Sequence, residues 1–113
     1  MQAMLLFRRP PAAVGANADM GAWMAYMDAL RAAGVMRGGE RLGPPETATT
    51  LRLAAGRRLV QDGPFADTKE VLGGFVVIEV ADMAAALDWA ARCPAAQDGA
   101  VEVRPVLPPP GAA

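Results

Sequence analysis

Residues 73–80 read GGFVVIEV, and this stretch decides the fold. Phenylalanine, valine and isoleucine favour β-strands, so we expect a strand from Phe75 onward. Successive side chains of a strand point to opposite faces of the sheet, which puts Val76 and Ile78 on one face and Phe75 and Val77 on the other. Because both faces are apolar, this strand is expected at the centre of a sheet that is covered on both sides.

The segments on either side of this strand complete an α+β pattern. The expected elements are strands at 3–7, 35–42, 49–53, 57–61, 75–80 and 100–106, a helix from Asn17 or Asp19 to Ala33, and a helix from Met83 to about Arg92 behind an Asp82 cap. The two short strands form a hairpin, and without it the order is βαββαβ, the ferredoxin-like split motif. In that motif the strands 3–7 and 75–80 are the central, antiparallel pair.

The central strands need a cover that one chain does not supply. Two helices shield only one face of such a sheet, and the second face is also apolar. The simplest cover is the same face of a second copy, so we predict a homodimer that forms a dimeric α+β barrel. The alternative is that the hairpin strand at 57–61 or the proline-rich C-terminal segment folds over this face. We place the domain at residues 1–107 and treat residues 108–113, PPPGAA, as a tail.

The composition excludes several kinds of function. The 113 residues carry a formal net charge of −1, which gives no long-range field toward nucleic acid or an anionic membrane. The chain contains neither histidine nor serine, so by itself it forms no Ser-His triad, no Cys-His dyad and no His-ligated metal site. One cysteine excludes an internal disulfide, and no apolar run approaches the length of a membrane span or a signal core. We therefore expect a cytoplasmic protein without nucleic-acid partner, membrane partner, cofactor or metal.

A longer motif surrounds the turn after the hairpin: residues 60–70 read VQDGPFADTKE, and LGGF follows at 72–75. Shorter segments accompany it, namely AAGV at 32–35, GGE at 38–40, WAA at 89–91 and VEVRPV at 101–106. In this combination the chain resembles the DGPF branch of the YCII-related family over nearly its whole length. The resemblance implies a ferredoxin-like fold and a dimeric α+β barrel, in agreement with the polarity of the strands.

The same resemblance implies little about activity. YCII relatives pair a histidine on the first helix with an aspartate just before a proline after the second helix. Here there is no histidine and Cys93 precedes Pro94, so that mechanism does not carry over. Cys93 lacks a base, and its place at a helix C-terminus disfavours a thiolate, so we expect a packed small residue. The association of DGPF proteins with extracytoplasmic-function sigma factors implies a regulatory partner as an alternative role.

The loop after the hairpin carries the first candidate site residues. Asp62 opens the turn, and Lys69, the only lysine, follows in the same loop. A carboxylate beside a lysine in a cleft can have its pKa tuned for proton transfer, so these two are candidate catalytic residues. Phe65 is the candidate binding residue of the loop. The alternative is structural, with an Asx-turn at Asp62 and a solvated charge at Lys69.

Glu40, Glu79 and Arg104 form a second group of candidate binding residues. Glu79 shares a face with Phe75, the face assigned to the dimer, where a carboxylate must be paired or line a wet cavity. Arg104 on the last strand is its expected partner. The alternatives are a polar pocket inside the barrel, joined by Asp62, and a structural ion pair at its rim.

The first helix carries an apolar stripe. Its members are Met20, Trp23, Met24, Met27 and Leu30. This pattern predicts a core face, with a flexible ligand pocket as the alternative. The function we infer is binding of a small organic metabolite in the cleft beside this helix, with a histidine-independent reaction left open. The alternative is a regulatory interaction module linked to a sigma factor.

Overall fold

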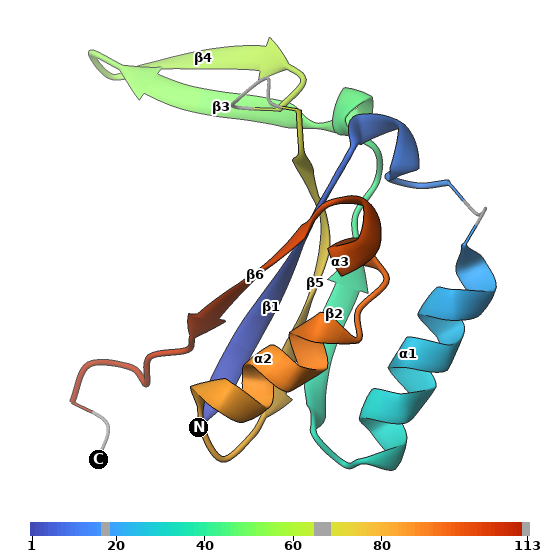
Figure 1. Cartoon of the computed structure of the whole chain (residues 1–113). Coiled ribbons are helices and arrows are strands. Elements are labelled where there is room, and N and C mark those ends of the chain that lie inside the picture. Colours follow the sequence, from blue (N-terminus) through green and yellow to red (C-terminus); the bar gives the residue numbers. More distant parts are fainter. Residues whose placement is uncertain (17–18, 65–68, 112–113) are drawn as a thin grey trace.

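The computed structural model describes residues 1–16, 19–64 and 69–111. An antiparallel four-stranded sheet of order β2-β5-β1-β6 forms the main body, and a two-stranded sheet, β3-β4, stands apart (Figure 1). The strands are β1 (Gln2–Arg9), β2 (Met36–Arg41), β3 (Thr49–Ala54), β4 (Arg57–Asp62), β5 (Val71–Glu79) and β6 (Ala100–Pro105). The helices are α1 (Met20–Ala32), α2 (Met83–Ala91) and α3 (Ala95–Asp98), with single 3-10 turns at Pro11–Ala13 and Pro45–Thr47. The predicted α+β fold is confirmed, including β1 and β5 as the central pair and the hairpin insertion.

The core lies on one face of the sheet, where the helices pack (Figure 1). Leu5 of β1 and Val76 and Ile78 of β5 point to this face and are fully buried. Tyr26 and Leu30 of α1 meet them from the helix side. Burying a large apolar side chain contributes about 1.5–3 kcal/mol, so this one layer supplies most of the hydrophobic stabilisation.

Sequence periodicity does not predict the short helix α3. Its four residues are too few to show a repeat, and only the preceding Pro94 marks the start. The helix places Ala95 in the core with no exposed surface. It also brings Asp98 to Arg9 of β1, which matters for the site described below.

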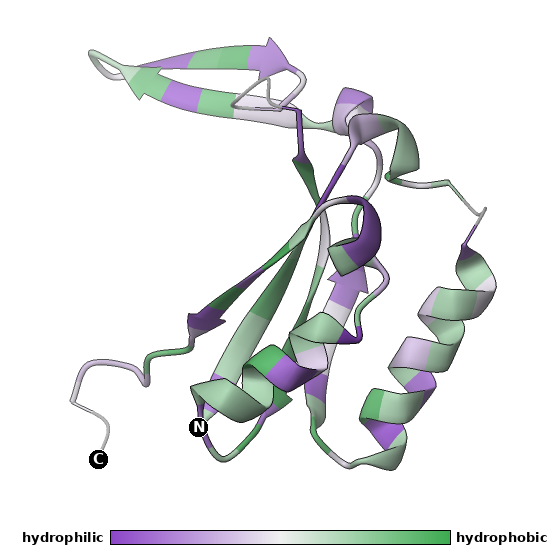
Figure 2. Cartoon of the chain, viewed as in Figure 1, coloured by the Kyte–Doolittle hydropathy of each residue, from purple (hydrophilic) through white to green (hydrophobic). Residues whose placement is uncertain are grey.

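The opposite face of the sheet, called the open face below, carries no helix of the described chain (Figure 1). Its middle is apolar, as the green central strands of Figure 2 show. Leu6 pairs with Phe75 and Met4 with Val77 in register across β1 and β5, and all four are half-buried. The second apolar face expected from the sequence is therefore present and uncovered in the single chain.

The β3–β4 hairpin extends away from the main sheet (Figure 1). Ala55 and Gly56 form its turn with φ of 49° and 78°, the positive values that a type I′ turn requires. Leu51, Leu53 and Leu59 are 48%, 69% and 51% exposed. The alternative in which this hairpin folds over the open face is thus not what the structure has.

The Gly38-Gly39 pair lies at an irregularity of β2. The pairing with β5 shifts between Met36 and Gly38, which leaves Arg37 as a bulge. At Gly39 the strands approach so closely that a Cβ atom would lie 2.6 Å from the carbonyl oxygen of Phe75. The glycine pair therefore lies beside a bulge and at a close approach of two strand backbones.

The substitution Gly39→Ala is expected to lower the free energy of unfolding by about 2 kcal/mol, because β5 must move to admit the methyl group. The control is Gly38→Ala, where an added Cβ meets no atom within 4 Å. Urea unfolding of both variants measures the difference. Equal effects at the two positions would contradict the close approach.

Candidate functional site

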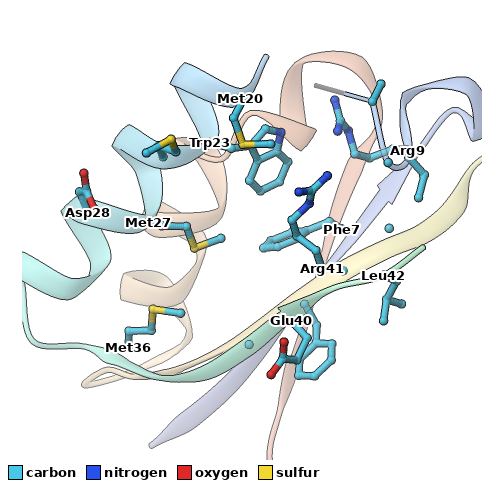
Figure 3. A pocket seen from close by; sticks show the side chains of 18 of the residues that line it. Phe7, Arg9, Met20, Trp23, Met27, Asp28, Met36, Glu40, Arg41 and Leu42 are labelled. Atoms are coloured by element: carbon cyan, nitrogen blue, oxygen red, sulfur yellow. The ribbon is translucent and has the colours of Figure 1, made fainter. Parts of the chain in front are cut away.

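A pocket of about 420 Å³ lies between α1 and the sheet (Figure 3). Its volume is in the range of small-molecule sites. The lining residues are Phe7, Arg9, Val14, Gly15, Ala16, Met20, Trp23, Met24, Met27, Asp28, Arg31, Met36, Gly39, Glu40, Arg41, Leu42, Gly73, Gly74 and Phe75. Gly39 of β2 and Gly73 and Gly74 of β5 contribute backbone alone to the floor, which leaves space below α1.

The walls of the pocket are mainly aromatic and sulfur-containing side chains. The rings of Phe7 and Trp23 pack with their centroids 4.9 Å apart. Met20 and Met27 of α1 and Met36 of β2 complete this wall (Figure 3). Methionine adapts its shape to irregular surfaces, so the wall suits a flat organic ligand.

The apolar stripe of α1 has two roles. Trp23 and Met27 pack against the buried core, as the prediction of a core face requires, and Leu30 is fully buried. Trp23, Met27 and the remaining stripe residues, Met20 and Met24, also line the pocket, and Met24 is 59% exposed. The stripe therefore belongs both to the core and to a pocket wall.

A cluster of charges closes one end of the pocket. The guanidinium of Arg9 lies 2.7 Å from Asp19 and 2.8 Å from Asp98, and its side chain is 10% exposed. The indole Nε1 of Trp23 donates to the same Asp19 oxygen at 3.1 Å. The hydrogen bond with Asp98, opposed by the burial of the cation, raises the pKa of Arg9 above its ordinary value. The cluster ties β1 to α1 and α3, and it explains why Asp19 at the start of α1 forms no side-chain capping bond.

The pocket has further charged lining residues. Arg31 and Asp28, both exposed on α1, form an ion pair at 3.5 Å. Arg41 at the end of β2 points into the pocket (Figure 3). Glu40, the residue before it, points to the other side of the sheet, as alternation along a strand requires.

The candidate residues of the loop after the hairpin do not line this pocket. Asp62 is exposed at the end of β4, opposite Thr49, and Lys69 is exposed just before β5. Phe65 lies outside the described residues. The catalytic roles considered for Asp62 and Lys69 stay predictions.

Glu40, Glu79 and Arg104 all belong to the open face. Glu79 pairs with the N-terminal ammonium of Met1 at 3.1 Å, whereas Arg104 lies 3.7 Å from Glu102. The expected pairing of Glu79 with Arg104 is therefore wrong within one chain. The register explains this, because Glu79 stands opposite Gln2 at the end of β1, and Arg104 stands opposite Met4.

Among the pocket residues that the sequence did not single out are Arg9, Arg41 and Met36. Arg9 and Arg41 lie in or beside ordinary strand patterns, and nothing local shows which face they take. A signal for the pocket was present in the methionine and tryptophan stripe of α1, and in the paired glycines that remove side chains from its floor.

Cys93 is a packed residue, as expected. It has no exposed surface, and burial raises the pKa of its thiol to about 11. Tyr26, another possible acid, donates its hydroxyl to the carbonyl of Trp89 at 2.8 Å, and burial raises its pKa as well. Neither group is a nucleophile or a proton donor near neutral pH. Among the described residues, no three potential ligands from histidine, cysteine, aspartate and glutamate gather at one place.

Comparison with known proteins identifies the family. The model of the YCII-related domain matches residues 1–109, so the chain belongs to the YCII-related family. An uncharacterized protein of Rhizobium meliloti strain 1021 is 48% identical over 68 residues. That match includes 58% of this chain and spans about half, 55%, of the relative's length.

A solved structure supports the fold. The 5-chloro-2-hydroxyhydroquinone dehydrochlorinase from Burkholderia phenoliruptrix AC1100, in complex with 2,5-dihydroxybenzoquinone, superposes with a TM-score of 0.56. The two chains are 18% identical, and the match covers 95% of this chain and 94% of the other. Within the described residues, none of the helices has the length and hydrophobicity needed to cross a membrane.

Raising the pH from 8 to 11 is expected to destabilise the protein through Cys93. The pKa of the thiol in the folded protein, about 11, lies above the ordinary value of 9.0. The contribution of the neutral thiol to the free energy of unfolding is therefore fully present below pH 9 and is lost as the pH rises to 11. The loss is about 2 kcal/mol.

The measurement compares the free energies of unfolding of the wild type and Cys93→Ala across this range. The wild type should lose more stability than the variant, which cannot ionise at this position. Parallel curves would mean that the thiol is not buried in this way.

Proposed function

We propose that this chain, of the DGPF branch of the YCII-related family, binds a small organic metabolite in the pocket between α1 and the sheet. The observation that carries the proposal is the 420 Å³ pocket itself, with an aromatic and methionine wall and charged groups among its lining residues. Small-molecule sites are commonly built from apolar walls and a few fixed polar groups.

A ligand of the size of one aromatic ring fits this proposal. The similar dehydrochlorinase holds 2,5-dihydroxybenzoquinone, and the half-buried Trp23 offers an aromatic surface to a planar compound of this kind. Any reaction must proceed without histidine. We keep Asp62 and Lys69 as candidates for proton transfer and Phe65 as an apolar contact, because their loop leads directly into β5, which contributes to the pocket floor.

We also propose that the protein is a homodimer through the open face. An apolar middle between β1 and β5 supports this, since exposed sheet faces normally alternate with polar residues. Charges of both signs surround it: Glu40 has no ion pair within the described chain, and Arg104 is 71% exposed. In a two-fold arrangement Glu40, Glu79 and Arg104 of the two copies face the space between the sheets, which is the polar pocket proposed from the sequence.

The second candidate is a regulatory interaction module associated with an extracytoplasmic-function sigma factor. The exposed leucines of the β3–β4 hairpin support a protein partner. This role predicts that the pocket binds no small molecule. For either role we expect a cytoplasmic protein, because a single cysteine gives no sign of an oxidising compartment.

A ligand screen tests the binding proposal. We expect planar one-ring compounds, 2,5-dihydroxybenzoquinone among them, to shift the NMR signals of the Trp23 indole and of Gly39, Gly73 and Gly74. Met27→Ala should weaken binding several-fold, because the methionine forms part of the wall.

The matched control is Met83→Ala, which also shortens a half-buried methionine on the core but lies outside the pocket. It should leave the affinity unchanged. Shifts that fall elsewhere, or no shifts with any compound, would rule out this pocket as the binding site.

Light scattering coupled to size exclusion tests the dimer. The wild type should have the mass of two chains, and Leu6→Glu should convert it to a folded monomer, because a charge would be buried at the interface. Leu87→Glu, at a 52% exposed position on α2, is the control and should remain dimeric. A monomeric wild type at micromolar concentration would end the proposal of a shared sheet interface.

A further inference from the structure

Arg41 is the pocket cation that has no counter-ion among the residues that the structure describes. Arg9 is committed to Asp19 and Asp98, and Arg31 to Asp28. The Arg41 guanidinium makes neither an ion pair nor a hydrogen bond with any part of the chain that the structure describes. Its neighbour Glu40 is not its counter-ion, because the Glu40 side chain points to the opposite side of the sheet (Figure 3).

The surroundings of Arg41 favour an anionic partner that is planar. Figure 3 places the Arg41 side chain inside the pocket, on the side where Phe7 and Trp23 lie. A guanidinium presents donors in a flat fork that matches a carboxylate with two parallel hydrogen bonds. Trp23 beside it supplies the apolar contact for a ring attached to that carboxylate.

The Arg9 cluster does not offer a second anion site. One guanidinium and two carboxylates at Arg9, Asp19 and Asp98 leave that cluster with a net charge of −1, so it repels an anion. Arg41, and not Arg9, is therefore the cation in the pocket that receives the anionic group. The uncharged part of the ligand then extends along the methionine wall (Figure 3).

We propose that the pocket selects a small aromatic carboxylate, or an organic anion of the same shape, and that Arg41 is the residue that recognises its negative charge. This inference rests on the proposed function, because it assigns a ligand class to the same pocket. The inference also names Arg41 as a residue that determines the specificity of this pocket.

The test compares benzoate with benzamide, which has the same ring and nearly the same shape but no charge. Titrations followed by the Trp23 indole NMR signal should show about tenfold tighter binding of benzoate to the wild type, the difference expected for one charge-assisted contact. Arg41→Gln should remove this preference by weakening benzoate about tenfold while leaving benzamide within twofold. Residue 41 is exposed, so this substitution should leave the core intact, and the amide NMR spectrum of the variant shows whether it has folded.

The control is Arg31→Gln, which removes another arginine from the lining of the pocket, one already paired with Asp28. It should keep the preference for benzoate. Equal affinities of the two compounds for the wild type, or a preference that survives Arg41→Gln, would overturn the assignment to Arg41 and leave the binding function intact. Binding of neither compound would count against both the inference and the proposed function.

Discussion

The antiparallel pairing of β1 with β5 is the interaction on which the rest of the structure depends. Both strands are apolar on both faces, so they are stable only where each face is shielded from water. The helices shield one face, with Leu5, Val76 and Ile78 buried beneath them. The other face remains open in the single chain, and it is the main reason for proposing a second copy.

The pocket follows from the way in which α1 is held over this sheet. The helix is anchored through Tyr26 and Leu30 in the core and through the ion pair of Asp19 with Arg9 at its start. Between these anchors the strands below it carry glycines instead of side chains, so the helix and the sheet do not fill the space between them. Protein cores are normally close-packed, so such a gap is unusual. Its aromatic and methionine wall suits the gap to binding a small molecule.

The chain has no histidine, so it cannot use the histidine–aspartate pair that the family resemblance implied from the sequence. A charge-recognition site does not need that pair, because an arginine binds an anion at any physiological pH. The charges of the pocket are arranged accordingly: the Arg9 cluster has a net charge of −1, and Arg41 has no counter-ion among the described residues. This arrangement is suited first to binding with a defined orientation, and to catalysis only with groups other than histidine.

Much of the fold is encoded locally and was therefore accessible from the sequence. The strand from Phe75, the end of the first helix near Ala33 and the start of the second helix at Asp82 all follow from propensity, periodicity and turn chemistry. The exclusion of triads and His-ligated metals follows from composition alone.

Tertiary structure decided what depends on the register of strands and on distances between residues remote in the chain. The partnership of Arg9 with Asp98 joins residues 89 positions apart, and no local pattern predicts it. The opposite directions of Glu40 and Arg41, and the separation of Glu79 from Arg104, follow from the pleat and the register of β2, β5, β1 and β6. The sequence therefore determined the elements, the central pair and the classes of chemistry that are excluded, whereas only the assembled sheet and helix decided which charged side chains share a pocket, because that depends on three-dimensional proximity.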